Sequence, residues 1–287
     1  MKKLTIISGK GGTGKTSLVG SFAVLADKNA VLVDGDVDAA NLSLITRPTL
    51  FEKHDFRASK VASIDPEKCE SCGLCRELCR FEAIAADYLV DPVSCEGCAF
   101  CFYACPYDAV VMEEKLSGQW FVSETPYGPL VHARLGIAEE NSGKLVTTIR
   151  NKGQELAGVT GKEFLIIDGP PGIGCPVIAS LSGVDAALAV TEPTVSGIHD
   201  LERVLAVCDH FGVPSAVCIN RYDLGEEQSA IIEEYCRNKN IIMAGKIPFD
   251  KNFIEAMIQG VPVVEYTYGP LSAQIASVWE NFSAMVN

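Results

Sequence analysis

Two groups of residues in this chain have types and spacings that could support chemistry: a glycine-rich loop near the N-terminus and two runs of cysteines. The loop occupies residues 9–16 and has the pattern G-x-x-x-x-G-K-T. An apolar stretch typical of a strand precedes it at 4–7, and a stretch typical of a helix follows at 17–27. In that setting, backbone N–H groups and the helix N-terminus bind phosphate. The loop therefore predicts a nucleotide site.

The side chains of this loop have distinct expected roles. Lys15 is expected to reach the β- and γ-phosphates, and the hydroxyl of Thr16 to hold Mg²⁺. A glycine-rich turn without a ligand is the alternative, which the complete pattern in its proper context disfavours. The expected nucleotide-binding residues of the loop are Gly11, Gly12, Thr13, Gly14, Lys15, Thr16 and Ser17.

The cysteine runs share one spacing, C-x₂-C-x₂-C-x₃-C. They consist of Cys69, Cys72, Cys75 and Cys79, followed by Cys95, Cys98, Cys101 and Cys105. Three thiolates spaced in this way can bind one face of a cubane cluster while a fourth returns from elsewhere. Zinc is the main alternative, because C-x₂-C pairs also form Cys₄ sites. Zinc would not need the third cysteine of each run, so the spacing favours iron–sulfur clusters.

Carboxylates follow two further apolar stretches. Residues 31–33 lead to Asp36, and residues 164–167 lead directly to Asp168. Carboxylates at the carboxyl ends of strands beside a phosphate loop suit Mg²⁺ binding and water positioning. Asp168 has the arrangement of a Walker B aspartate. For Asp36, a solvated loop acid is the alternative.

Composition limits the possible partners and location. The chain has 287 residues, 48% hydrophobic content and a formal net charge of −13. Such an acidic chain has no general attraction for nucleic acid or anionic lipid, so we expect neither nucleic-acid binding nor a membrane anchor. Twelve cysteines beside a nucleotide loop indicate metal ligands before disulfides, and hence a cytoplasmic protein.

The loop also carries an early lysine, Lys10, and so resembles the deviant phosphate loop of the MinD/ParA/Mrp and nitrogenase iron protein superfamily. The cysteine runs resemble a bacterial-type ferredoxin with two [4Fe–4S] clusters. The combined resemblance implies a P-loop ATPase domain at residues 1–63 and 114–287, with a small α+β ferredoxin domain inserted at 64–113. Independently, alternating strands and helices predict an α/β fold with a doubly wound, mostly parallel sheet.

The resemblance implies roles for particular residues. Lys10 would cross a dimer interface to the partner's nucleotide, so we expect an ATP-dependent homodimer. Asp36 would be the switch I residue that orients the attacking water, and Asp168 would begin switch II. The N-R-x-D sequence starting at Asn220 and Arg221 resembles the base-recognition motif of MinD-like ATPases.

Pro248, after the last predicted strand, is expected near the same base. In the ferredoxin resemblance the fourth cysteine of each run belongs to the other cluster. One cluster would take Cys69, Cys72, Cys75 and Cys105, and the other would take Cys95, Cys98, Cys101 and Cys79. Arg80 stands where the family usually has Pro, which affects local packing and not ligation.

These expectations favour one function over two alternatives. The favoured function is an ATPase that couples nucleotide state to electron delivery toward an unidentified client metalloprotein, which could be a paralogous ATPase. Eight cysteines in two complete ligand sets would hold clusters tightly, which suits electron transfer. The alternatives are an iron–sulfur cluster carrier of the Mrp type, and a MinD/ParA-like positioning or assembly switch with structural clusters.

Three further features carry no assigned chemistry. Cys175 follows the DGPPG turn, and we expect it to be buried and inert, as we do Cys208, Cys218 and Cys236. The polar stretch 139–144 favours a solvated turn, with a partner-contact surface as the alternative. Residues 271–285 have helical apolar spacing without Lys or Arg, which predicts a helix docked on the core and not on a membrane.

Overall fold

The computed structural model describes residues 1–136, 139 and 142–286. The chain divides into two compact units. The first comprises Met1–His54, Trp120–Arg134 and Ser142–Asn287, and the second comprises Asp55–Gln119 and Leu135–Asn141. The chain leaves the first unit along strand β3 (Thr49–Ile64) and returns to it along β4 (Val110–Thr125).

The strands form a nine-stranded sheet in the order β3-β4-β5-β2-β6-β1-β7-β8-β9. From β5 to β9 every neighbouring pair is parallel. This confirms the predicted α/β fold with a mostly parallel sheet. The remaining strands are β1 (Lys2–Ser8), β2 (Ala30–Asp34), β5 (Gly128–Leu135), β6 (Phe164–Pro171), β7 (Ala186–Thr191), β8 (Ser215–Asn220) and β9 (Ile242–Ile247).

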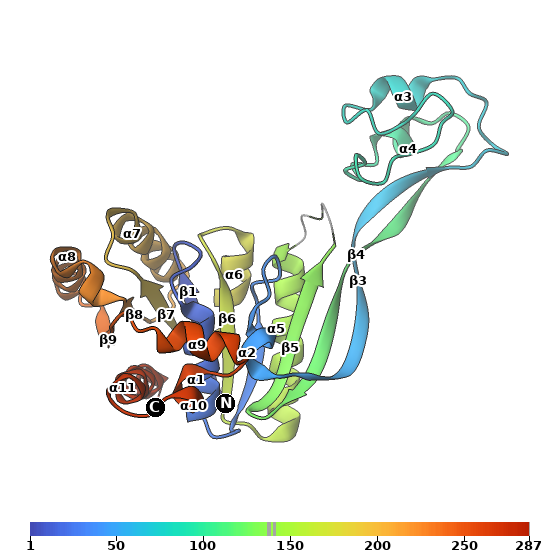
Figure 1. Cartoon of the computed structure of the whole chain (residues 1–287). Helices are drawn as coiled ribbons and strands as arrows, with labels where there is room; N and C mark the ends of the chain where they lie inside the picture. Colours follow the sequence, from blue (N-terminus) through green and yellow to red (C-terminus); the bar gives the residue numbers. More distant parts are fainter. Residues whose placement is uncertain (137–138, 140–141, 287) are drawn as a thin grey trace. The chain divides into compact units, whose positions relative to one another are not determined.

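Helices cover both faces of the parallel strands (Figure 1). One apolar cluster joins the sheet to α1, α10 and α11, and a second joins it to α6, α7 and α8. Strands buried on both faces are mostly apolar, as β2 and β7 are up to their last residues, Asp34 and Thr191. The helices of this unit are α1 (Lys15–Leu25), α2 (Leu42–Thr46), α5 (Ser142–Thr160), α6 (Cys175–Leu181), α7 (Val195–His210), α8 (Glu226–Asn238), α9 (Asn252–Ile258), α10 (Val263–Tyr266) and α11 (Pro270–Ser283).

The topology places the carboxyl ends of several parallel strands at one edge of the sheet. The chain passes from β1 to β2, which lies on one side of β1 in the sheet, and from β6 to β7, which lies on the other side of β1. Such a switch point creates a crevice beyond the strand ends. Because the glycine-rich loop follows β1 directly, it lies at this switch point.

The C-terminal helix packs against the core, as predicted. Helix α11 buries Leu271, Ile275, Val278, Trp279 and Phe282. The Trp279 ring lies 5.2 Å from that of Phe22 and 5.1 Å from that of Phe164, measured between centroids. None of the helices in the described part of the chain is long and apolar enough to cross a membrane.

The second unit contains the two cysteine runs and the short helices α3 (Leu74–Leu78) and α4 (Phe100–Ala104). The runs have the same backbone conformation at matched positions. Left-handed φ angles recur at Ser71 and Gly97, at Gly73 and Ala99, and at Glu82 and Asp108. The repeat seen in the sequence is therefore also a repeat of the backbone.

Candidate functional site

A large cleft lies beyond the carboxyl ends of the central strands in the first unit. It has about 1730 Å³ of space between protein atoms, part of it open to solvent. Most of the residues predicted to bind nucleotide line it together: Gly11, Gly12, Gly14, Lys15, Thr16, Ser17, Asp36, Asn220, Arg221 and Pro248. The predicted residues Lys10, Thr13 and Asp168 are not among the described residues that line this cleft.

The glycines of the loop allow its turn into α1. Gly12 and Gly14 have φ angles of 81° and 91°, which side chains with a Cβ rarely adopt. A Cβ on Gly14 would also lie 2.4 Å from the Asn220 Nδ2 atom. Lys15 opens the helix and is 6% exposed, so its ammonium is held at the floor of the cleft.

Two carboxylates lie buried at the ends of neighbouring strands. Asp34 in β2 pairs in register with Asp168 in β6, and both are almost fully inaccessible. Burial and the charge of Asp168 raise the pKa of Asp34 well above its ordinary value. Its carboxylate accepts hydrogen bonds from the N–H of Leu42 at 3.0 Å and of Asp36 at 3.3 Å. Asp34 therefore fixes the loop that carries Asp36.

The other member of the pair, Asp168, is differently placed. Among the described residues, neither of its carboxylate oxygens has a partner with full hydrogen-bond geometry, although the Thr16 hydroxyl lies close enough to favour the charged form. Burial raises its pKa to about 6, while the Lys15 ammonium and the Thr16 hydroxyl lower it. A buried carboxylate without a donor is costly unless a cation compensates it. Asp168, beside Thr16, thus fits a Mg²⁺ ion bound directly or through water.

Asp36 stands on the cleft side of this acidic group. It is half-buried, and burial raises its pKa while the charge of Lys15 lowers it. The side chain lines the cleft together with Lys15 and Thr16. A carboxylate in this position can accept a proton from, or orient, a water molecule near the end of a bound triphosphate.

At the other end of the cleft, the β8 terminus contacts the loop. The Asn220 Nδ2 donates to the Thr13 carbonyl at 2.8 Å, and its Oδ1 accepts from the Arg221 N–H at 3.1 Å. These two bonds leave Asn220 one N–H and one lone pair for a ligand. Arg221 has a left-handed backbone with φ of 58° and forms an ion pair with Glu192.

Lys10 is directed to the start of α7. Its ammonium lies 3.4 Å from Glu192 Oε2, 3.4 Å from Thr194 Oγ1 and 3.5 Å from Ser196 Oγ. In this chain Lys10 therefore contacts oxygens of its own subunit. A role for Lys10 across a dimer stays a prediction.

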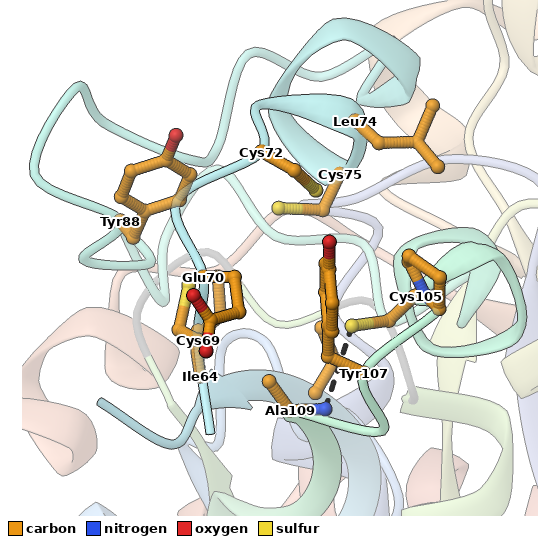
Figure 2. Close-up of a pocket in the computed structure, with 12 residues that line it drawn as sticks. Ile64, Cys69, Glu70, Cys72, Leu74, Cys75, Tyr88, Cys105, Tyr107 and Ala109 are labelled. Atoms are coloured by element: carbon orange, nitrogen blue, oxygen red, sulfur yellow. Dashed lines mark hydrogen bonds between the residues drawn. The ribbon is translucent and has the colours of Figure 1, made fainter. Parts of the chain in front are cut away.

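The eight cysteines of the second unit gather in two cavities. The first is lined by Cys69, Cys72, Cys75 and Cys105, so three come from the first run and one from the second (Figure 2). The N–H of Ala109 donates to the Cys105 sulfur at 3.4 Å. Burial raises the pKa of the Cys75 thiol, and the neighbouring thiolates raise it further.

The second cavity mirrors the first. It is lined by Cys95, Cys98, Cys101 and Cys79. This grouping agrees with the crossed pattern in which each run lends its fourth cysteine to the other.

The donor atoms do not converge as they would around one ion. In the part of the chain that the structure describes, no three His, Cys, Asp or Glu side chains form a group that could hold a single metal ion. Zinc requires its ligands at one point, about 2.0–2.3 Å away. A cubane cluster instead places its own iron and sulfide between the thiolates, so its ligands need not meet at one point.

The remaining cysteines differ from one another. Cys208, Cys218 and Cys236 are buried in the core, as predicted. The prediction for Cys175 is wrong, because this residue is exposed as the first residue of α6. Of the polar stretch 139–144, residues 140 and 141 lie outside the described residues, and Ser142–Lys144 form the first turn of α5.

The fold and cleft can be compared with known proteins. A family model described as the CobQ/CobB/MinD/ParA nucleotide binding domain matches residues 4–263. The chain belongs to this family. Its MinD and ParA members are ATPases, which supports ATP binding and hydrolysis in general.

Individual relatives of this MinD/ParA-family chain have varied names. An uncharacterized protein of Methanocaldococcus jannaschii is 37% identical over 225 residues, covering 76% of this chain and 78% of the relative. An iron-sulfur cluster carrier protein of Pyrococcus horikoshii is 28% identical over 122 residues, covering 38% and 41%. The structure of MinD with Mg-ADP from the same organism has a TM-score of 0.58 at 19% identity, covering 97% and 94%. That last likeness shows the fold alone.

Sequence reasoning missed two residues of this site. The sequence does not single out Asp34, although its side chain is fully buried and fixes the following loop. Glu192 follows β7 and joins Lys10 to Arg221. The sequence could have indicated Glu192, because a carboxylate at the carboxyl end of a parallel strand lies at the edge of the sheet where the cleft forms.

The raised pKa of Asp168 predicts a pH-dependent stability of the nucleotide-free protein. Between the ordinary value of 3.8 and about 6, the folded state binds more protons at this residue than the unfolded state. Stability must therefore fall as pH rises through this window, by roughly 3 kcal/mol for a two-unit shift. Asp168→Asn should reduce this fall, and the burial of Asp34, whose pKa is also raised, should leave the remainder. Urea unfolding of the nucleotide-free protein at pH 4 and pH 7 measures the difference.

The matched control is Asp209→Asn, which removes an exposed carboxylate of α7. It should keep the wild-type difference between the two pH values. Equal differences for Asp168→Asn and wild type would show that Asp168 does not retain its proton in the fold.

Proposed function

We propose that this protein is an ATP-dependent dimeric switch that couples nucleotide state to two [4Fe–4S] clusters, and through them to electron delivery toward a client metalloprotein. The observation that carries the proposal is the sorting of eight cysteines into two four-cysteine cavities, within a chain that also has a MinD/ParA nucleotide cleft. Neither feature alone distinguishes this function from simpler ones.

The nucleotide half of the proposal rests on the cleft. Lys15 would contact the β- and γ-phosphates, the residues of the 9–16 loop would surround them with N–H groups, and Asn220 would use its free N–H and lone pair on adenine. Arg221 and Pro248 line the cleft at the same end and would pack against the base. The resemblance to MinD-like ATPases implies these base-binding roles, and the position of the three residues in the cleft supports them.

The hydrolysis step needs a cation and an oriented water. Thr16 and Asp168 would hold Mg²⁺, because the Asp168 oxygens have no other donor among the described residues. Asp36 would position the water for in-line attack on the γ-phosphate. Loss of the γ-phosphate would release the residues after Asp168, whose Gly172 N–H donates to the Ser8 carbonyl at 2.9 Å beside the loop.

The cluster half rests on the donor set. All twelve cysteines are free thiols. In each cavity three of the cysteines are buried or half-buried and one is exposed, Cys72 in the first and Cys98 in the second. Left-handed residues in loops turn N–H groups toward a common centre, as in the nests that hold many iron–sulfur sites. When bound, each cluster would supply one-electron chemistry. The chain would fix its position through four thiolates from two segments.

Electron delivery is favoured over a positioning switch with structural clusters. Cys72 and Cys98 reach the surface of their unit, so both cavities have an edge that a partner can approach. A purely structural metal site is normally closed. The client is identified only by chemistry, as a metalloprotein that accepts single electrons, and a paralogous ATPase is one form it could take.

A second candidate function is cluster delivery. It is favoured by the 28% identity to an iron-sulfur cluster carrier protein of Pyrococcus horikoshii. That likeness spans only 38% of this chain. A carrier must lose its cluster to an apo-acceptor, whereas an electron donor retains it over repeated cycles. Iron remaining on the chain after incubation with an apo-ferredoxin therefore separates the two functions.

The cluster assignment predicts a specific metal content. Protein purified without oxygen should contain about eight iron and eight sulfide per chain, as two [4Fe–4S] clusters require. Cys79→Ala should lose the cluster of the second run, and Cys105→Ala that of the first, because fourth ligands cross over. Metal analysis and EPR of each variant provide the measurement.

Cys208→Ala is the matched control, since Cys208 is buried in the core of the other unit and lines neither cavity among the described residues. It should keep all its iron. Stoichiometric zinc, or about four iron in the unaltered protein, would contradict the two-cluster assignment.

The two loop lysines should fail in different ways. Lys15→Ala should abolish ATP binding, because Lys15 lines the cleft of its own chain. Lys10→Ala should keep ATP binding but lose ATP-dependent dimerisation and roughly 10³-fold in turnover, the effect of removing a charge supplied in trans. Calorimetric ATP binding, sedimentation and phosphate release measure the three properties.

Each lysine variant serves as the control for the other, because both remove one charge from the same loop. Full turnover in Lys10→Ala, or a wild-type chain that stays monomeric with ATP and Mg²⁺, would contradict the role in trans.

A further inference from the structure

The ammonium of Lys10 has well-defined partners within its own chain. Glu192, Thr194 and Ser196 surround it with one carboxylate and two hydroxyl oxygens at 3.4 to 3.5 Å. Glu192 follows β7, and Thr194 is the N-cap of α7, where its hydroxyl accepts from the Gly197 N–H at 3.0 Å. These oxygens lie at the start of α7, where the N-cap hydrogen bond fixes the backbone, so they form a preformed binding site for the Lys10 ammonium.

We propose that Glu192 is a positioning residue that holds Lys10 in the unassociated chain and must release it before the dimer can close. This inference rests on the proposed function, in which Lys10 acts on the nucleotide of the partner subunit. Glu192 would thereby set how readily ATP drives dimerisation.

Glu192 and a partner's phosphate would compete for the Lys10 ammonium for an electrostatic reason. If the ammonium contacted Glu192 and a partner's phosphate at once, the carboxylate and the phosphate would lie within a few ångströms and repel each other. The loop backbone has little room to move away, because it is packed against α7 at Gly9. A Cβ on Gly9 would lie 2.4 Å from the Asp200 carbonyl oxygen. The Lys10 side chain itself must therefore swing out.

Release leaves Glu192 paired. Its other oxygen accepts from the Arg221 guanidinium, so the carboxylate keeps a cationic partner when Lys10 departs. This matters because the Glu192 side chain is only 13% exposed, and an unpaired charge there would be costly. Arg221 adjoins Asn220, which binds the Thr13 carbonyl in the middle of the phosphate loop. The intrachain site of Lys10 is thus connected, through Arg221 and Asn220, to the end of the cleft where the base would bind.

The ion pair between Lys10 and Glu192 is weak enough to open reversibly. Lys10 is 31% exposed, and ion pairs of such exposure contribute little to stability. Two such contacts open when a symmetric dimer forms. If each contact holds Lys10 by about 2- to 5-fold, removing the Glu192 charge should lower the apparent dimer dissociation constant roughly 4- to 25-fold.

The first measurement is dimerisation. Glu192→Gln, compared by sedimentation with the unaltered chain in Mg²⁺ and a non-hydrolysable ATP analogue, should dimerise at the lower concentration. Glu202→Gln, which removes an exposed charge from the same helix, should match the unaltered chain. An unchanged dissociation constant for Glu192→Gln would overturn the proposal.

The second measurement uses the nucleotide-free monomer and does not depend on dimers. Acetylation of Lys10, followed by peptide mass spectrometry, should be about 2- to 5-fold faster in Glu192→Gln than in the unaltered chain, with exposed Lys239 as the internal reference. Equal acetylation rates of Lys10 in Glu192→Gln and in the unaltered chain would overturn the proposal that Glu192 holds Lys10. If instead Lys10→Ala dimerises normally, the proposed role in trans fails, whatever the acetylation rates show.

Discussion

The nucleotide end of this protein depends on two carboxylates that the sheet forces together. Asp34 and Asp168 occupy paired positions at the ends of parallel strands, and neither side chain reaches solvent. Two buried like charges repel, so the site needs a proton or a cation there. Asp34 is satisfied by the N–H groups of Leu42 and Asp36, whereas Asp168 faces Lys15 and Thr16. The pair thus has one structural member and one member available to a metal.

This arrangement links the nucleotide to the chain segment that carries the cysteines. The loop after Asp34 contains Asp36 and leads through α2 into β3, the strand along which the chain passes to the second unit. The chain returns along β4 to β5, which pairs in parallel with β2 between Leu32 and Leu130. The chain therefore enters the second unit shortly after the loop that Asp34 fixes, and it returns by β4 to the strand next to β2.

Local patterns predicted much of this molecule, and long-range contacts account for what they missed. The phosphate loop, the apolar strands and the packing of α11 depend on short periodicities, and the described residues confirm all three. The two cavities group the cysteines as the ferredoxin resemblance implies, with three from one run and the fourth from the other. By contrast, the pairing of Lys10 with Glu192 joins segments far apart in the sequence. The exposure of Cys175 likewise depends on how α6 lies on the sheet, which no local pattern encodes.

The central claim is that nucleotide state and cluster state share free energy, and a redox titration tests it directly. Cluster potentials would be measured by EPR in Asp36→Ala protein with and without ATP and Mg²⁺, so that hydrolysis does not intervene. Coupling between sites is typically about 1–3 kcal/mol. For a one-electron couple this predicts a shift of roughly 40–130 mV in at least one cluster. Potentials that agree within ~10 mV in both states, far below one tenfold change in affinity, would contradict the account.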